Sequence, residues 1–242
     1  MKWFLCMLFC LTAVSLAASP LTVVTEELPP YSHVENGEVV GMSTEVVKAT
    51  LKRAGLPYRI EIYPWARALS VAQSTDNVLI YSILRTPERD RMFKWVGTIA
   101  PRKAYFFKLR ARRDVVVHTL EDAKWYAIGG VKDDARVQYL QSKGIEVKVL
   151  STKEDLNIRQ LEYGRIDLMI ANEYTFNYRV KALGLAPHLF EKAFFLEEFS
   201  KNEFSMAFSL GTDDSLVAKT RAALERLKAS GEYKRIIEKY TK

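Results

Sequence analysis

The stretch NVLIYSILRTPER, residues 77–89, is an apolar run that ends abruptly at a cluster of charges. Residues 78–84 lack the strict alternation of a half-buried strand and predict a strand that is buried on both faces, as in parallel sheets. Three arginines follow it: Arg85, Arg89 and Arg91. Because ligands of open α/β sheets bind beyond the carboxyl ends of the strands, a binding site is expected here.

The residues before this strand alternate between strand and helix patterns. Residues 21–25 predict a short apolar strand, and residues 43–54 predict a helix with one apolar face that stops at Gly55. Residues 58–63 alternate like a half-buried strand, and residues 65–74 predict a short helix. This βαβαβ order predicts a parallel sheet.

The second half of the chain repeats this order. Residues 125–131, 145–150 and 166–171 predict strands, and Asp133 or Asp134 is expected to cap a helix that reaches Ser142. Ser151 and Glu154 have the spacing of a capping box at the start of another helix. Residues 103–112 and 203–210 are extended, and the last forty residues are helical. We therefore expect two α/β lobes joined by two crossings, with the C-terminal helices packed on the first lobe.

The first eighteen residues predict a secretory signal peptide. Lys2 precedes an apolar stretch from Trp3 to Leu16, and small residues follow it, so cleavage is expected after Ala17 or Ala18. Both cysteines lie in this segment, which leaves a mature chain without disulfides. The expected location is the periplasm.

Charge and composition narrow the function classes. The formal net charge of +7 favours anionic ligands, but lysines and arginines are spread along the whole chain, so no nucleic-acid-binding stripe is expected. The three histidines, His33, His118 and His188, lack the spacing of metal ligands. Neither a metal nor a cofactor is predicted.

Five short motifs, in this order and spacing, resemble the periplasmic solute-binding proteins of the polar amino-acid-binding family, the receptors of ABC importers. They are LPPYS (28–32), GMSTEVV (41–47), TPER (86–89), GRIDLMIANE (164–173) and LERLKASGEYKRIIEKY (224–240). YPWARAL (63–69) looks like a divergent branch of this family.

The resemblance implies an α/β, two-lobed, periplasmic-binding-protein-like (type II) fold. Each lobe would be a mostly parallel sheet flanked by helices, and a two-strand hinge would join the lobes. The implied boundaries are a signal peptide at 1–18, lobe 1 at 19–107, lobe 2 at 108–203 and a return to lobe 1 at 204–242. The implied function is capture of a small polar solute, an amino acid or related carboxylate, by a monomer that delivers it to an inner-membrane ABC permease.

The resemblance gives Arg89 the central role in the site. The family places an arginine here that pairs with the ligand carboxylate, and a guanidinium binds a carboxylate with two parallel hydrogen bonds. The alternative is a surface ion pair with Glu88 or Asp90. Arg85 is a weaker candidate for the same ligand group, and Arg91 is expected to be solvated.

Further candidates surround this arginine in lobe 1. Tyr31 lies where the family stacks an aromatic ring, and Trp65 is expected either in the opposite wall or in the core. Tyr81 and Ser82 precede the arginines, and the family often has a glycine at Ser82. Leu84 stands where a threonine commonly contacts the carboxylate, and this departure removes a hydroxyl.

Lobe 2 is expected to supply the opposite wall. Asp133 lies where the family presents helix-start NH groups, and helix capping is the favoured role for it and for Asp134. Asn172 aligns with the ammonium-binding aspartate of the family and lacks its charge. Glu173, the next residue, is an alternative source of that charge, although neighbouring residues in a strand point to opposite faces.

Two other functions stay open at this point. A few relatives of the fold are periplasmic cyclohexadienyl dehydratases, for which the arginines would hold the anion and Glu173 would be the acid. A third possibility is a ligand sensor that docks on a membrane signalling receptor.

Overall fold

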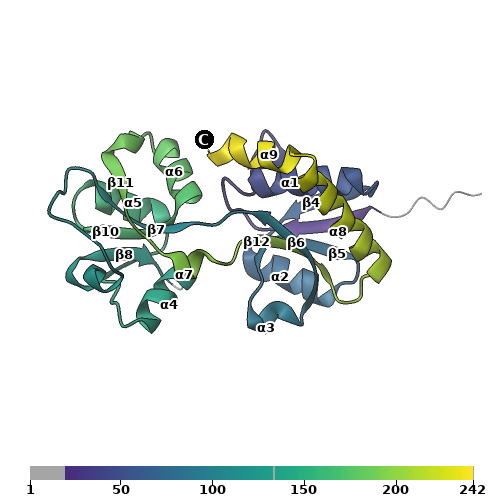
Figure 1. Cartoon of the computed structure of the whole chain (residues 1–242), viewed down its shortest axis with the longest axis horizontal. Helices are drawn as coiled ribbons and strands as arrows, with labels where there is room; N and C mark the ends of the chain where they lie inside the picture. Colours follow the sequence, from purple (N-terminus) through teal and green to yellow (C-terminus); the bar gives the residue numbers. More distant parts are fainter. Residues whose placement is uncertain (1–19, 133, 242) are drawn as a thin grey trace, which may run out of the picture.

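The computed structural model describes residues 20–132 and 134–241 (Figure 1). The predicted signal peptide and the predicted site residue Asp133 lie outside these residues. In the part of the chain that is described, no helix combines the length and the apolar character needed to cross a membrane.

The first lobe is built on a five-stranded sheet with the strand order β4-β1-β5-β12-β6. β1 (Leu21–Thr25) pairs in parallel with β4 (Tyr58–Ile62) and β5 (Val78–Leu84). β12 (Phe204–Ser209) is antiparallel to both of its neighbours, β5 and β6 (Phe93–Ala100). A small hairpin of β2 (His33–Glu35) and β3 (Glu38–Val40) stands apart from this sheet.

The second lobe repeats this pattern with the order β11-β7-β10-β8-β9. β8 (Ile128–Val131) is parallel to β9 (Val149–Ser151) and to β10 (Leu168–Asn172). β7 (Ala104–Leu109) is antiparallel to β10 and to β11 (Phe190–Phe195). Each sheet is therefore mostly parallel, with one antiparallel strand.

Two segments connect the lobes and run side by side in Figure 1. The chain leaves the first sheet at the end of β6 and enters the second sheet at β7 after three residues, 101–103. It returns through α7 (Glu197–Ser200) into β12. The predicted two-lobed α/β fold with two connecting segments is confirmed.

Helices cover both faces of each sheet. In the first lobe, α1 (Met42–Arg53), α8 (Asp214–Ala229) and α9 (Glu232–Thr241) pack on one face, and α2 (Trp65–Ser74) covers the other. α3 (Pro87–Asp90) is one short turn after β5. In the second lobe, α4 (Ala135–Ser142) packs on one face, whereas α5 (Glu154–Glu162) and α6 (Glu173–Ala182) pack on the other. Two 3₁₀ turns, Glu121–Trp125 and Pro187–Leu189, complete this lobe.

The buried strands explain why patterning predicted them well. In β10, Leu168 and Ile170 enter one core, and Met169 and Ala171 enter the other. A strand with apolar cores on both sides has apolar residues at every position. The helix predicted over residues 65–74 is observed with these bounds.

The predicted capping box at Ser151 is wrong. Ser151 is the last residue of β9, and its hydroxyl donates to Oδ1 of Asn157 at 2.7 Å. The helix begins later, with Lys153 at its N-cap position and no side-chain cap. The other expected cap is correct, because Asp134 accepts a hydrogen bond from the backbone N–H of Arg136 at the start of α4.

The turn that holds Tyr31 against α1 depends on Gly41. The N–H groups of Met42 and Ser43 donate to the carbonyls of Pro30 and Tyr31, at 2.8 and 3.0 Å. Gly41 has φ of 120°, and a Cβ there would lie 2.6 Å from the carbonyl oxygen of Tyr31. A side chain at this position must therefore displace backbone.

We expect Gly41→Ala to lower the free energy of unfolding by about 3 kcal/mol or more, because it combines a backbone clash with positive φ. The matched control is Gly37→Ala, at φ of 80° with open space around it, where only backbone strain of about 1 kcal/mol is expected. Urea unfolding of both variants measures the difference. Equal losses of stability in the two variants would show that the short contact with the Tyr31 carbonyl oxygen does not contribute to the cost.

Candidate functional site

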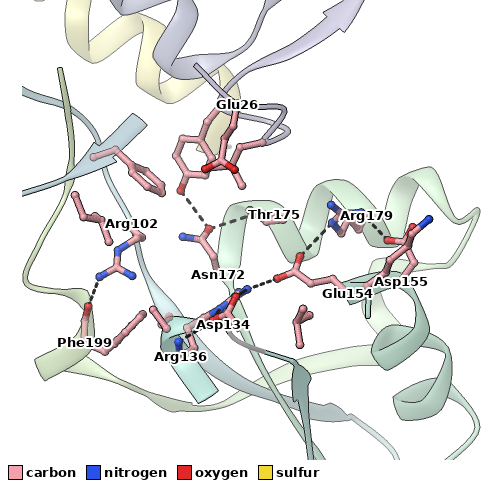
Figure 2. Close-up of a pocket in the computed structure, with 18 of the residues that line it drawn as sticks. Glu26, Arg102, Asp134, Arg136, Glu154, Asp155, Asn172, Thr175, Arg179 and Phe199 are labelled. Atoms are coloured by element: carbon pink, nitrogen blue, oxygen red, sulfur yellow. Dashed lines mark hydrogen bonds and ion pairs between the residues drawn. The ribbon is translucent and has the colours of Figure 1, made fainter. Parts of the chain in front are cut away.

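A cavity of about 590 Å³ lies between the lobes, and both lobes line it (Figure 2). Leu28, Tyr31, Leu84 and Phe204 come from the first lobe, together with Glu26, which directly follows β1. The other lining residues belong to the connecting segments and the second lobe: Arg102, Ala104, Val131, Asp134, Ala135, Arg136, Thr152, Lys153, Glu154, Asp155, Asn172, Thr175, Arg179 and Phe199. The cavity has the size of a small-molecule site.

Tyr31 joins the two lobes at this cavity. Its side chain is fully buried, and its hydroxyl lies 2.9 Å from the carbonyl oxygen of Pro101 and 3.2 Å from Oδ1 of Asn172. Its ring packs edge-on against Phe204, with the centroids 4.8 Å apart. Burial raises the pKa of Tyr31 well above its ordinary value, so the hydroxyl stays a donor.

Asn172 ends β10 and caps α6. Its Oδ1 accepts the backbone N–H groups of Tyr174 and Thr175, at 3.0 and 3.4 Å. Since two backbone donors require an acceptor, these bonds fix which way the amide faces. Within the described residues, the amide nitrogen is buried and has no hydrogen-bond partner.

A chain of alternating charges forms the floor of the cavity (Figure 2). Arg136 lies 2.6 Å from Asp134 and 2.6 Å from Glu154. Arg179 lies 3.1 Å from Glu154 and 2.8 Å from Asp155. Burial would raise the pKa of Asp134, but the hydrogen bond and charge of Arg136 hold it below its ordinary value. These five groups neutralise one another except for one negative charge.

Arg102, in the first connecting segment, has a different environment. Its Nε and Nη2 donate to the backbone carbonyls of Asn202 and Phe199, and its guanidinium stacks on the ring of Phe199 at 4.2 Å. Within residues 20–132 and 134–241, the hydrogen bonds of its guanidinium go to backbone carbonyls and none goes to a carboxylate. Burial and the neighbouring charge of Arg136 lower the pKa of Arg102 to about 10. Arg102 therefore brings to the cavity a positive charge that no carboxylate of the described residues binds directly, although the charge of nearby Asp134 acts on it.

Glu26 faces the cavity from the first lobe. Burial raises its pKa from 4.5 to about 7, against the opposing charge of Arg89. Arg89 follows the cap of α3 and holds its guanidinium 5.2 Å from the centroid of the Trp65 ring. Arg89 and Trp65 are half-buried neighbours and are not among the residues that line the cavity.

The other predicted residues fall in several places. Leu84 lines the cavity, whereas Tyr81 is fully buried and its hydroxyl shares a 2.8 Å hydrogen bond with Thr44. Arg85 forms an ion pair with Asp90 at 2.6 Å and lines a separate, smaller pocket. Glu173 forms an ion pair with Lys192.

Ser82 shapes the end of β5. It has φ of 59°, and the pairing of β5 with β12 shifts register here. Such a bulge turns the following side chains to the opposite faces. Ile80 and Ile83, which strict alternation would put on opposite faces, therefore enter the same core, and Leu84 reaches the cavity side.

Sequence reasoning missed Glu26, Arg102 and the charged floor. Glu26 could have been found, because it stands directly beyond the carboxyl end of a predicted strand. Nothing in the sequence around Arg102 and Arg136 marks them as site residues, because the sequence pattern around a buried arginine is the same as that around a solvated one. No cluster of three metal-ligating side chains occurs in residues 20–132 and 134–241.

Comparison with known proteins agrees with this architecture. Residues 21–111 match the bacterial extracellular solute-binding proteins, family 3. The resemblance predicted from the sequence is confirmed. The chain is similar to solute-binding proteins of the amino-acid type, such as the probable amino-acid-binding protein YxeM of Bacillus subtilis (strain 168). The two are 22% identical over 219 residues, which are 87% of this chain and 79% of YxeM.

Solved structures share the solute-binding fold. A histidine kinase sensor domain with similarity to periplasmic binding proteins superposes with a TM-score of 0.73 at 20% identity, covering 92% of this chain and 96% of that one. An ancestral arginine-binding protein bound to glutamine gives 0.69 at 23% identity, covering 91% and 97%. The GlnP substrate-binding domain 2 of Lactococcus lactis, in an open conformation, gives 0.70 at 18% identity, covering 91% and 94%.

We expect Arg136→Met to lower the free energy of unfolding by about 3–5 kcal/mol, because it leaves Asp134 without its cation and leaves the buried Glu154 with Arg179 alone. The control is Arg59→Met, which removes an exposed ion pair with Glu61 and should cost less than about 1 kcal/mol. Urea unfolding at neutral pH measures both. Equal losses would mean that the charged floor does not stabilise the second lobe.

A second prediction concerns the pH dependence of stability. The folded chain holds the proton of Glu26 more tightly than the unfolded chain does, so ionising this group destabilises the fold as pH rises from 4.5 to about 7. Glu26→Gln should remove this loss, so at about pH 8 it should be more stable than the parent by up to about 3 kcal/mol. Unfolding experiments at about pH 4.5 and pH 8 measure the slope of the free energy of unfolding against pH. The control Glu27→Gln, at an exposed neighbour, should leave the slope unchanged.

Proposed function

We propose that this protein is a periplasmic receptor that captures a small polar solute between its lobes and delivers it to an ABC importer. The observation that carries this proposal is the cavity of about 590 Å³, which polar and charged side chains of both lobes line. A ligand in such a site holds the lobes together, and its loss allows them to separate about the connecting segments.

The charges of the cavity favour a solute with an anionic group. No ion pair of the described residues includes Arg102, whereas both arginines of the charged floor are paired with carboxylates and the floor keeps one negative charge. A half-buried guanidinium that no carboxylate contacts is stabilised by an anionic group placed against it, and an anionic ligand supplies one. The ligand class that follows is an amino acid or a related carboxylate. This agrees with the family resemblance and with the ligands of a similar structure, an ancestral arginine-binding protein bound to glutamine or to arginine.

Two further functions can be separated from import. The overlap with a histidine kinase sensor domain makes sensing the second candidate. Neighbouring genes for a permease and an ATPase would favour import, and an adjacent signalling protein would favour sensing. For the dehydratase-like alternative, Glu173 was the candidate acid, and it is held by Lys192. Product formation from prephenate or arogenate would establish that activity.

The test is to identify the solute that co-purifies with the mature protein by mass spectrometry, and to measure thermal shifts with amino acids, carboxylates and amines. A true ligand at about 100 times its Kd should stabilise the protein by about 2.7 kcal/mol. Size-exclusion chromatography checks the expected monomer. Stabilisation by none of these solutes, with none co-purifying, would contradict a solute-binding role.

A further inference from the structure

The amide of Asn172 presents a donor to the cleft. The family resemblance assigns an ammonium-binding aspartate to this position, which would require an oxygen facing the ligand. Here the one side-chain oxygen accepts from the N–H groups of Tyr174 and Thr175 and from the hydroxyl of Tyr31. Turning the amide over would set its NH₂ group against two backbone donors, so this orientation is fixed by α6 itself.

The remaining NH₂ group has no partner in the described structure. Asn172 is 7% exposed and lines the cavity, and Figure 2 shows its nitrogen turned to the side on which Arg102 lies. Buried donors are nearly always hydrogen-bonded, because an unsatisfied one loses its hydration without compensation. An acceptor that arrives with the ligand would satisfy it.

Arg102 is the second donor on this side of the cavity. Two of its nitrogens hold backbone carbonyls, which fix the guanidinium beside the cavity. Its nearest charged neighbours include Arg136 and Asp134, and Asp134 is already bound to Arg136. The Arg102 and Arg136 guanidiniums repel one another, and an anion placed beside Arg102 relieves this repulsion.

We propose that the cleft binds the anionic group of its ligand between the guanidinium of Arg102 and the amide NH₂ of Asn172. The inference rests on the proposed function and adds which charged group of the ligand lies beside Arg102 and Asn172. An ammonium group is excluded from this position because Arg102 and the free face of Asn172 offer only N–H donors. Arg89 then interacts with Glu26 in the first lobe, where burial lowers the pKa of Arg89 and the charge of Glu26 opposes that effect.

The decisive variant is Asn172→Asp. An aspartate keeps an oxygen for the N–H groups of Tyr174 and Thr175, so α6 stays capped. Its second oxygen replaces the NH₂ donor with a negative charge. An anionic ligand group here should lose about 100-fold or more in affinity, because a donor is replaced by a like charge. An ammonium group here would instead bind more tightly, so the two models predict opposite signs.

The probes are L-glutamate, L-glutamine and L-arginine, with 4-aminobutyrate, glutarate and agmatine as analogues that lack one charged group. Calorimetry on the full mature chain gives Kd for each. We expect binding to require a carboxylate, and Arg102→Gln to weaken the best probe by about 30-fold or more.

The matched control is Asn177→Asp, which adds the same charge to an exposed position of α6 and should change Kd less than about 3-fold. Asn172→Ser keeps a capping oxygen without the amide and should also weaken binding. Thermal unfolding without ligand checks that each variant folds.

Unchanged or tighter binding by Asn172→Asp would overturn the proposal and leave the receptor function standing. So would binding of agmatine in preference to arginine, or a large loss from Arg89→Ala when Arg102→Gln has none. Failure of every probe to bind the parent protein would contradict this inference and the amino-acid or carboxylate ligand class, and the receptor function itself would be contradicted only if no solute co-purified either.

Discussion

The structure depends on one topological constraint: the first sheet is complete only when the chain returns to it from the second lobe. β12 stands between β5 and β6, and it enters the first sheet only after the chain has built the second lobe. β7 stands between β10 and β11, directly after the first crossing. Because the second lobe is inserted between β6 and β12 of the first sheet, two connecting segments run between the lobes, and the carboxyl ends of the parallel strands face a common cleft.

This constraint explains the chemistry of the cleft. Glu26 follows β1, Leu84 ends β5 and Asn172 ends β10, so three distant segments meet at one cavity. Arg102 comes from a crossing segment and is anchored by carbonyls of the returning segment. The guanidinium of Arg102 is thus held by the two connecting segments rather than by either lobe.

The two walls of the cavity differ in whether their charged groups are paired with one another. The second-lobe floor pairs each of its two arginines with carboxylates, of which Glu154 is buried, and it keeps one net negative charge. The first-lobe side has Glu26, whose pKa is raised to about 7 by burial, and Arg89 near it. Paired charges resist rearrangement, since separating them leaves an uncompensated ion in a medium of low dielectric constant. Arg102, in contrast, forms no ion pair within the described residues.

The sequence by itself determined the alternation of strands and helices, the two-lobed fold and the edge of the sheets at which the cleft lies. These follow from local periodicity and from rules that hold for every open parallel sheet. Tyr31, Leu84 and Asn172 were predicted for the site and line the cavity, because each lies at or near a strand end. Only the tertiary structure decided which charges are paired: Arg136 is neutralised by residues before and after it in the chain, whereas Arg102 is not. It also decided that Asn172 shows its NH₂ to the cleft, since that depends on hydrogen bonds made at the start of α6 and on a tyrosine 141 residues away. The pairing of the charges and the orientation of the Asn172 amide arise from contacts between distant segments. Residue type alone therefore does not predict them.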